Sequence, residues 1–233
     1  MQKPREIIQG VYLIKSKGSN CYLIANGDLV LIDTGMPGSE EALLGAIDAI
    51  GRRPQDLKQI LITHAHLDHV GSLAAIQKAT GASVLASRIE TDYIEGKKLF
   101  SSMHREGIGG SIFRMILFVL ENVSAKYSPA TVDIPWESSG SVDCLGGLEV
   151  IATPGHSPGS LSFYQREKRL LFVGDALGGR RPTLQLPSKF GCFSHRDALR
   201  SVKSLAELDF EICLLGHGEP ITDCADKKIR MLT

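Results

Sequence analysis

The chain has 233 residues, and its 26 lysines and arginines balance its 26 aspartates and glutamates. This length suits one α/β domain, since a single hydrophobic core can grow to about 250 residues before it splits. Balanced charge excludes an overall basic field that would attract nucleic acid or anionic membranes, so we expect neither partner. Residues Met1 to Glu6 lack the apolar segment of a signal peptide, which makes the cytoplasm the expected location.

The first fifth of the chain predicts a strand meander followed by a helix. Three short segments read as strands, at Gly10 to Lys15, Asn20 to Ala25 and Asp28 to Asp33. Asn26-Gly27 between the last two is typical of a hairpin turn. Ser39 is the expected N-cap of a helix that begins with two glutamates and repeats its apolar residues at helical spacing up to Ile50.

Strands and helices then alternate to the end of the chain. We expect a strand at Leu57 to Ile62, a helix from about Gly71 to Thr80, a strand at Ala82 to Ala86, a strand-rich region over 141–175, a helix at Arg196 to Leu208 and a strand at Glu211 to Leu215. This alternation is typical of α/β folds. The cysteines form no Cys-x-x-Cys pair, so we expect reduced thiols.

Four potential metal ligands, His64, His66, Asp68 and His69, follow directly after the strand predicted at Leu57 to Ile62. Imidazole and carboxylate groups are the ligands that zinc and iron favour. Scattered histidines would rarely gather in this way by chance. The segment therefore predicts a function that depends on a metal.

Three further candidates follow other predicted strands. His156, Asp175 and His217 each stand beside a glycine, which lets the backbone turn sharply and approach an ion closely. Open α/β sheets bind their ligands at the carboxyl ends of the strands. Together with the first four, these side chains are enough for two metal ions that share one ligand.

With Asp33 in Asp33-Thr34-Gly35, these residues form five motifs in order, and the chain resembles the metallo-β-lactamase-fold hydrolases. The resemblance implies a four-layer αββα sandwich in which residues 1–233 form one domain. It implies one metal on His64, His66 and His156 and a second on Asp68, His69 and His217, with Asp175 bridging the two. Asp33 would support a ligand imidazole or a metal-bound water.

The aspartate at position 175 points to a branch of this superfamily. In β-lactamases of the fold another residue type replaces it, so the chain is more similar to glyoxalase II, lactonases and general hydrolases. The resemblance implies an enzyme with two divalent ions, zinc first, with iron or manganese as alternatives. A metal-bridging hydroxide, oriented by Asp68 as the catalytic carboxylate, would cleave an ester-like bond such as a thioester or lactone. The alternatives are a mononuclear-iron persulfide dioxygenase and a phosphodiesterase of the same fold.

Two segments outside the motifs are expected to shape the substrate site. Residues 88–135 are expected to form a helical insertion or lid; the apolar run Ile112 to Leu120 within them could instead be a buried helix, a homodimer surface or a membrane contact. Arg180 and Arg181 are candidates for holding a carboxylate or phosphate of a small-molecule substrate.

Overall fold

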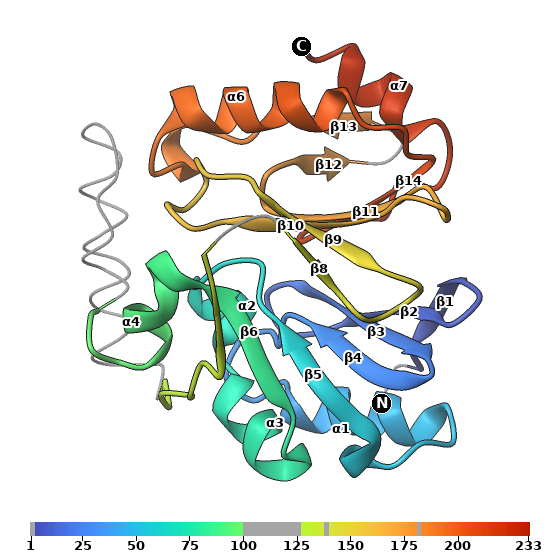
Figure 1. Cartoon of the computed structure of the whole chain (residues 1–233), viewed down its shortest axis with the longest axis vertical. Helices are drawn as coiled ribbons and strands as arrows, with labels where there is room; N and C mark the ends of the chain where they lie inside the picture. The colour runs from blue at the N-terminus through green and yellow to red at the C-terminus, as the bar shows by residue number, and fades with distance from the viewer. Residues whose placement is uncertain (1–2, 100–126, 138–139, 181–182) are drawn as a thin grey trace. The chain divides into compact units, whose positions relative to one another are not determined.

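The computed structural model describes residues 3–99, 127–137, 140–180 and 183–233, which fall into two compact units (Figure 1). The first unit, with the described residues up to 136, contains β1 (Arg5–Ile8), β2 (Val11–Lys15), β3 (Asn20–Asn26), β4 (Asp28–Ile32), α1 (Glu40–Ala49), η1 (Pro54–Asp56), β5 (Leu57–Leu61), α2 (Leu67–Val70), α3 (Leu73–Thr80), β6 (Ser83–Ser87), η2 (Arg88–Glu90), α4 (Thr91–Ile94) and β7 (Ile134–Trp136). The second unit contains β8 (Gly140–Val142), β9 (Leu148–Ala152), β10 (Leu161–Gln165), β11 (Leu170–Gly174), β12 (Gly178–Arg180), β13 (Thr183–Gln185), η5 (Lys189–Gly191), α6 (His195–Ala206), β14 (Ile212–Leu215) and α7 (Ala225–Arg230).

The sheet of the first unit runs from β1 to β7 in chain order. Its first four strands pair antiparallel, and β4, β5, β6 and β7 pair parallel. A hairpin cannot join parallel strands, which is why α1 lies between β4 and β5 and α3 between β5 and β6. Parallel pairing also brings the ends of β4 and β5 together, where the Asp33 N–H donates to the Leu61 carbonyl at 3.0 Å.

The helices α1 and α3 contact each other beside this sheet (Figure 1). Their inward sides bury Leu43, Ala46, Ile47, Leu73 and Ile76. Ser39 precedes α1 as predicted, but its side chain does not cap the helix. Its hydroxyl accepts the Lys17 N–H at 3.2 Å, and its own N–H donates to the Ser72 hydroxyl at 2.9 Å. Ser39 therefore ties two other loops to the start of α1.

The sheet of the second unit has the order β14-β11-β10-β9-β8. All of its pairs are antiparallel except β11 with β14. The strand-rich region predicted over 141–175 is thus confirmed. The helix predicted at Arg196 to Leu208 is α6, which begins one residue earlier because the Ser194 hydroxyl accepts the Asp197 N–H.

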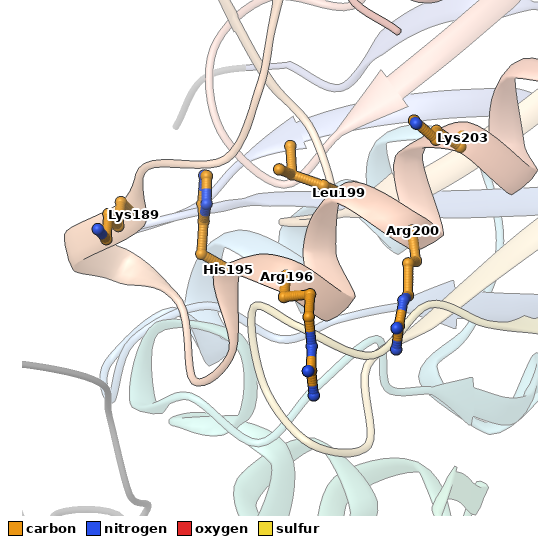
Figure 2. Close-up of a pocket in the computed structure, with 6 residues that line it drawn as sticks. All are labelled: Lys189, His195, Arg196, Leu199, Arg200 and Lys203. Atoms are coloured by element: carbon orange, nitrogen blue, oxygen red, sulfur yellow. The ribbon is translucent and has the colours of Figure 1, made fainter.

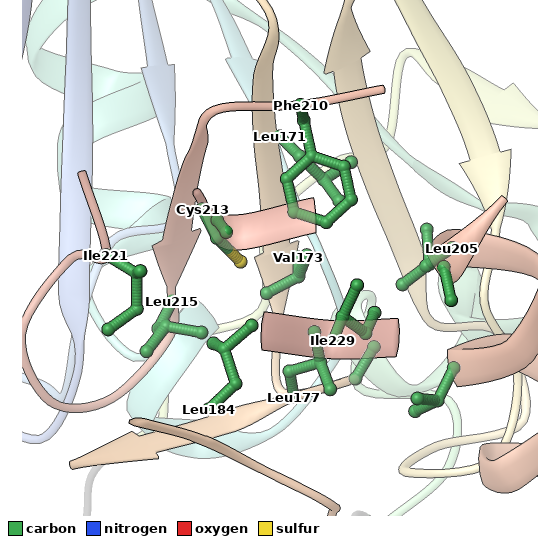
Figure 3. Packing of buried hydrophobic residues seen from close by; sticks show 14 of the residues in the cluster. Leu171, Val173, Leu177, Leu184, Leu205, Phe210, Cys213, Leu215, Ile221 and Ile229 are labelled. Carbon is green, nitrogen blue, oxygen red and sulfur yellow. The ribbon is translucent and has the colours of Figure 1, made fainter. Parts of the chain in front are cut away.

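A buried apolar cluster joins the short elements of the second unit to its sheet (Figure 3). Leu184 of β13 and Ile229 of α7 meet Val173 of β11 and Leu215 of β14 there. Neither the β12–β13 hairpin nor α7 is evident from the sequence, because such short segments show too little periodicity. Their place is decided by the apolar surface that they cover.

Residues 88–135 are described at their two ends. Arg88 to Ile94 form η2 and α4, and the backbone N–H of Ala130 donates to the Ile94 carbonyl at 3.2 Å. The run Ile112 to Leu120 lies outside the described residues, so the predicted insertion or lid stays a prediction, as does the single domain over 1–233. Among the described helices, none has the length and apolar character needed to cross a membrane.

Candidate metal ligands

The first group of candidate ligands follows β5 and continues into the one-turn helix α2. Nε2 of His64 lies 3.1 Å from Nδ1 of His66. Two nitrogens bound to one tetrahedral zinc at 2.0–2.1 Å would lie about 3.3 Å apart. The two imidazoles therefore already have a spacing that suits a shared ion.

Asp33 supports this group from the end of β4. Its Oδ2 lies 2.8 Å from Nδ1 of His69 and also accepts the Thr63 hydroxyl at 2.8 Å, while its Oδ1 accepts the Thr63 N–H at 2.8 Å. Asp33 has φ 59°, a left-handed conformation that aspartate tolerates better than most residues. Since a carboxylate only accepts, the His69 ring carries its proton on Nδ1, and Nε2 is the nitrogen whose lone pair can bind a metal.

Asp68 lies beside that ligand atom. Its Oδ2 is 3.8 Å from Nε2 of His69, and 31% of its side chain is exposed, whereas the His69 side chain is fully buried. The Asp68 carbonyl accepts the Ser19 hydroxyl, which holds its backbone. A Cβ on Gly18 would lie 2.8 Å from that of Asp68, so the glycine makes room for this carboxylate. The buried imidazole of His69 and the accessible carboxylate of Asp68 thus lie side by side.

Glu90, a residue that no sequence motif singles out, holds the backbone of this group of candidate ligands. Its side chain is 1% exposed, and its carboxylate accepts the N–H of Ala65, the residue between His64 and His66. A single glutamate after a strand resembles any surface acid, so the sequence carries no signal for it. Burial of a carboxylate is costly unless it is hydrogen-bonded, and this bond is made to the loop that carries the candidate ligands His64 and His66.

The second group lies within the second unit, where His156, Asp175 and His217 follow β9, β11 and β14. Nε2 of His156 is 3.4 Å and Nε2 of His217 is 3.2 Å from the same oxygen, Oδ2 of Asp175. The Gly216 N–H donates to the Gly174 carbonyl at 2.8 Å, which aligns the ends of β14 and β11 just before the ligands. One carboxylate oxygen therefore lies near two imidazoles, as a bridging ligand would.

The two residues just before α6 hold the loop that carries His156. The Ser194 N–H donates to the Gly155 carbonyl and the Phe193 N–H to the His156 carbonyl, both at 3.0 Å. Gly155 has φ 138°, and a Cβ on it would lie 2.1 Å from the Ala198 backbone nitrogen. Only glycine fits this contact, so the close approach of α6 fixes the position of the ligand loop.

The thiols are not part of either group. All five cysteines are reduced thiols, as predicted, and four of them are buried. Burial raises the pKa of the Cys21 thiol, which donates to the Ser16 hydroxyl at 3.4 Å. Cys21 therefore packs as a small neutral side chain.

Each unit thus brings its own predicted ligands together, and all seven side chains are candidates for holding a metal. Their assembly into one centre stays a prediction, as do the roles of Asp68 and Asp33. Arg180 contributes its backbone to β12, paired with Thr183. Its side chain and the whole of Arg181 lie outside the described residues, so their predicted substrate contact also stays a prediction.

Similarity to known proteins covers nearly the whole chain. A probable metallo-hydrolase, YflN of Bacillus subtilis, is 28% identical and aligns over 93% of this chain and 87% of its own length. The hydroxyacylglutathione hydrolase GloC of Haemophilus influenzae is 30% identical over 90% of each chain. The crystal structure of the metallo-β-lactamase family protein TTHA1429 from Thermus thermophilus matches with a TM-score of 0.74 and 26% identity, over 97% of this chain and 79% of that one.

These matches confirm the predicted α/β sandwich fold and the resemblance from which it was inferred. The model of the metallo-β-lactamase superfamily matches residues 16–217, a range that includes all seven candidate ligands. This chain belongs to the metallo-β-lactamase superfamily.

Proposed function

We propose that this protein is a hydrolase that holds two divalent metal ions, zinc first, and cleaves a thioester or lactone bond in a small molecule. One observation carries the proposal. Within each unit taken by itself, the nitrogen and oxygen atoms of neighbouring candidate ligands lie 3.1 to 3.8 Å apart, a spacing that suits a shared ion. The superfamily match over 16–217 and the metallo-hydrolase and hydroxyacylglutathione hydrolase relatives support hydrolysis of an ester-type bond.

The proposed division of ligands gives each ion three residues and one shared carboxylate. One ion binds His64, His66 and His156, the other binds Asp68, His69 and His217, and Asp175 binds both. The 3.1 Å spacing of the His64 and His66 nitrogens supports the first set, and the position of Asp68 beside Nε2 of His69 supports the second. The approach of His156 and His217 to one oxygen of Asp175 supports the bridging role.

Metal ions held in this way supply Lewis acidity and a water that ionises near neutral pH. The accessible carboxylate of Asp68 would orient the attacking water and accept its proton. Asp33 keeps the His69 proton on Nδ1, so that Nε2 remains a ligand, and Glu90 fixes the backbone between His64 and His66. No serine or cysteine nucleophile is needed.

The competing proposal within the same fold is a persulfide dioxygenase with one iron held by His64, His156 and Asp175. Such a centre would not use Asp68, His69 or His217. The pairing of His69 with Asp33 and the closeness of Asp68 to Nε2 of His69 favour a second ion instead.

Metal analysis of anaerobically purified protein, followed by a panel of thioester, lactone, phosphodiester and β-lactam substrates, tests the proposal. We expect two ions per chain, hydrolysis of a thioester or lactone, and a fall in kcat of about 10²- to 10⁴-fold in Asp68→Ala. Asp48→Ala, an exposed aspartate on α1, is the matched control and keeps wild-type activity. One iron per chain with rapid oxygen uptake on glutathione persulfide would overturn the proposal, and full activity in Asp68→Ala would overturn the role of that residue.

A further inference from the structure

A basic groove runs along the outer side of α6 in the second unit (Figure 2). It has a volume of about 460 Å³ and is lined by Lys189, His195, Arg196, Leu199, Arg200 and Lys203. His195, Leu199 and Lys203 form one row at helical spacing, and Arg196 and Arg200 form a second row beside it (Figure 2). Lys189, which comes from η5, closes the end next to His195.

The groove concentrates positive charge in a chain whose overall charge is zero. Within the described part of the chain, neither Lys189 nor Lys203 has a carboxylate partner within 4.0 Å. Arg196 and Arg200 share one carboxylate, Asp197, at 3.9 and 3.1 Å, but their side chains are 76% and 69% exposed. Exposed ion pairs are weak, so both guanidinium groups stay available to an anionic ligand.

An outward helix face is usually just solvated, and such faces normally mix both signs of charge. On α6 the outward residues from His195 to Lys203 include one acid, Asp197, whose carboxylate also accepts the Ser194 hydroxyl at 2.8 Å. The half-buried Leu199 lies in the first row, between His195 and Lys203 (Figure 2). A hollow with an apolar centre and cationic sides fits an elongated ligand with an anionic group.

The groove begins at the turn that holds a candidate metal ligand. His195 follows Phe193 and Ser194, whose N–H groups bind the carbonyls of His156 and Gly155. From His195 the groove extends to Lys203, about 12 Å along the helix at 1.5 Å per residue. A substrate whose scissile bond lies near His156 could therefore extend its other end along α6.

We propose that this groove binds the phosphate-bearing end of the substrate, which makes the substrate class a thioester or ester with a phosphorylated tail. This inference rests on the proposed hydrolase function. Phosphate suits the groove better than a single carboxylate, because its three oxygens and up to two negative charges can pair with the neighbouring guanidinium groups of Arg196 and Arg200 at once.

A matched pair of substrates tests the inference: S-acetyl-pantetheine and its 4′-phosphate, which differ only in the phosphate far from the thioester. At 150 mM salt we expect the phosphorylated compound to have at least a tenfold higher kcat/KM. In the double variant Arg196→Gln/Arg200→Gln the ratio of the two kcat/KM values should fall to near one. The control Lys168→Gln/Lys227→Gln removes two exposed lysines elsewhere on the second unit and should keep the ratio.

A second measurement does not depend on activity. It is the Kd of the S-methyl thioether of the phosphorylated compound, an analogue that has no thioester bond to hydrolyse. We expect at least a tenfold weaker Kd in Arg196→Gln/Arg200→Gln and an unchanged Kd in the control. Equal kcat/KM for the two thioesters, or a preference that survives in the double variant, overturns the inference and leaves the hydrolase intact. If neither thioester is cleaved, the proposal of thioester hydrolysis is wrong. If the Kd is the same in the wild type and the double variant, the groove does not bind the phosphate, whatever the activity.

Discussion

The imidazole of His69 lies 2.8 Å from the carboxylate of Asp33 through Nδ1, and both side chains are buried. The two residues are 36 positions apart, yet the parallel pairing of β4 with β5 places the ends of those strands side by side. The contact leaves Nε2 of His69 facing Asp68. A hydrogen bond between two buried groups thus decides which nitrogen can bind a metal.

Replacement of Asp33 by asparagine should weaken zinc binding about 10- to 100-fold, because the His69 proton loses its carboxylate acceptor. Asparagine tolerates the left-handed backbone of position 33 and can still accept the Thr63 N–H. Competition against a zinc-binding dye measures the change, with Asp48→Asn as the exposed control. Unchanged zinc affinity in Asp33→Asn would show that the contact does not tune the ligand.

Replacement of Glu90 by leucine should lower the free energy of unfolding by about 1–3 kcal/mol, because the buried Ala65 N–H loses its acceptor. Glu90→Gln keeps an acceptor oxygen, so the free energy of unfolding should fall by less than half as much as in Glu90→Leu. Urea denaturation of the metal-free protein measures both, and Glu41→Gln on the exposed side of α1 serves as control. If glutamine destabilises as much as leucine, the bond to Ala65 is not what Glu90 contributes.

Gly155→Ala should destabilise the protein by about 3 kcal/mol or more, because its Cβ would meet the backbone of α6. Gly81→Ala is the matched control: Gly81 has φ 73° but no atom within 4 Å of its would-be Cβ. Gly81→Ala should lower the free energy of unfolding only by the backbone strain, about 1–2 kcal/mol. Equal losses in urea denaturation would mean that α6 can move away from the His156 loop without penalty.

The stability contributed by Asp56 should depend on pH. Hydrogen bonds from the Arg53 backbone N–H and guanidinium lower the pKa of Asp56 from 3.8 to about 2. A lowered pKa in the folded state means that this contribution is present above about pH 4 and is lost as the pH falls toward 2. The Tm gap between wild type and Asp56→Asn should therefore narrow from pH 5 to pH 3, and a constant gap would contradict the shifted pKa.

The sequence predicted most of the regular elements because apolar residues repeat about every 2 residues in strands and about every 3.6 residues in helices. The strand predicted at Leu57 to Ile62 is β5, and the helix predicted from Gly71 to Thr80 is α3, preceded by the separate turn α2. Strand β7 and the strands of the β12–β13 hairpin have only three residues each, too few for a period to show. They are held by pairing and by packing with distant residues, which a local pattern cannot report.

By itself the sequence determined the α/β class, the seven candidate ligands and the superfamily, since residue type and order carry that information. Only the tertiary structure decided that Asp33 bonds His69, that Glu90 bonds the loop between His64 and His66, and that Gly155 must stay a glycine beneath α6. The same holds for the basic groove, whose rows become a surface feature only after α6 buries its apolar side. Contacts between residues far apart in the chain depend on strand order and helix packing, and neither is written in a local stretch of sequence.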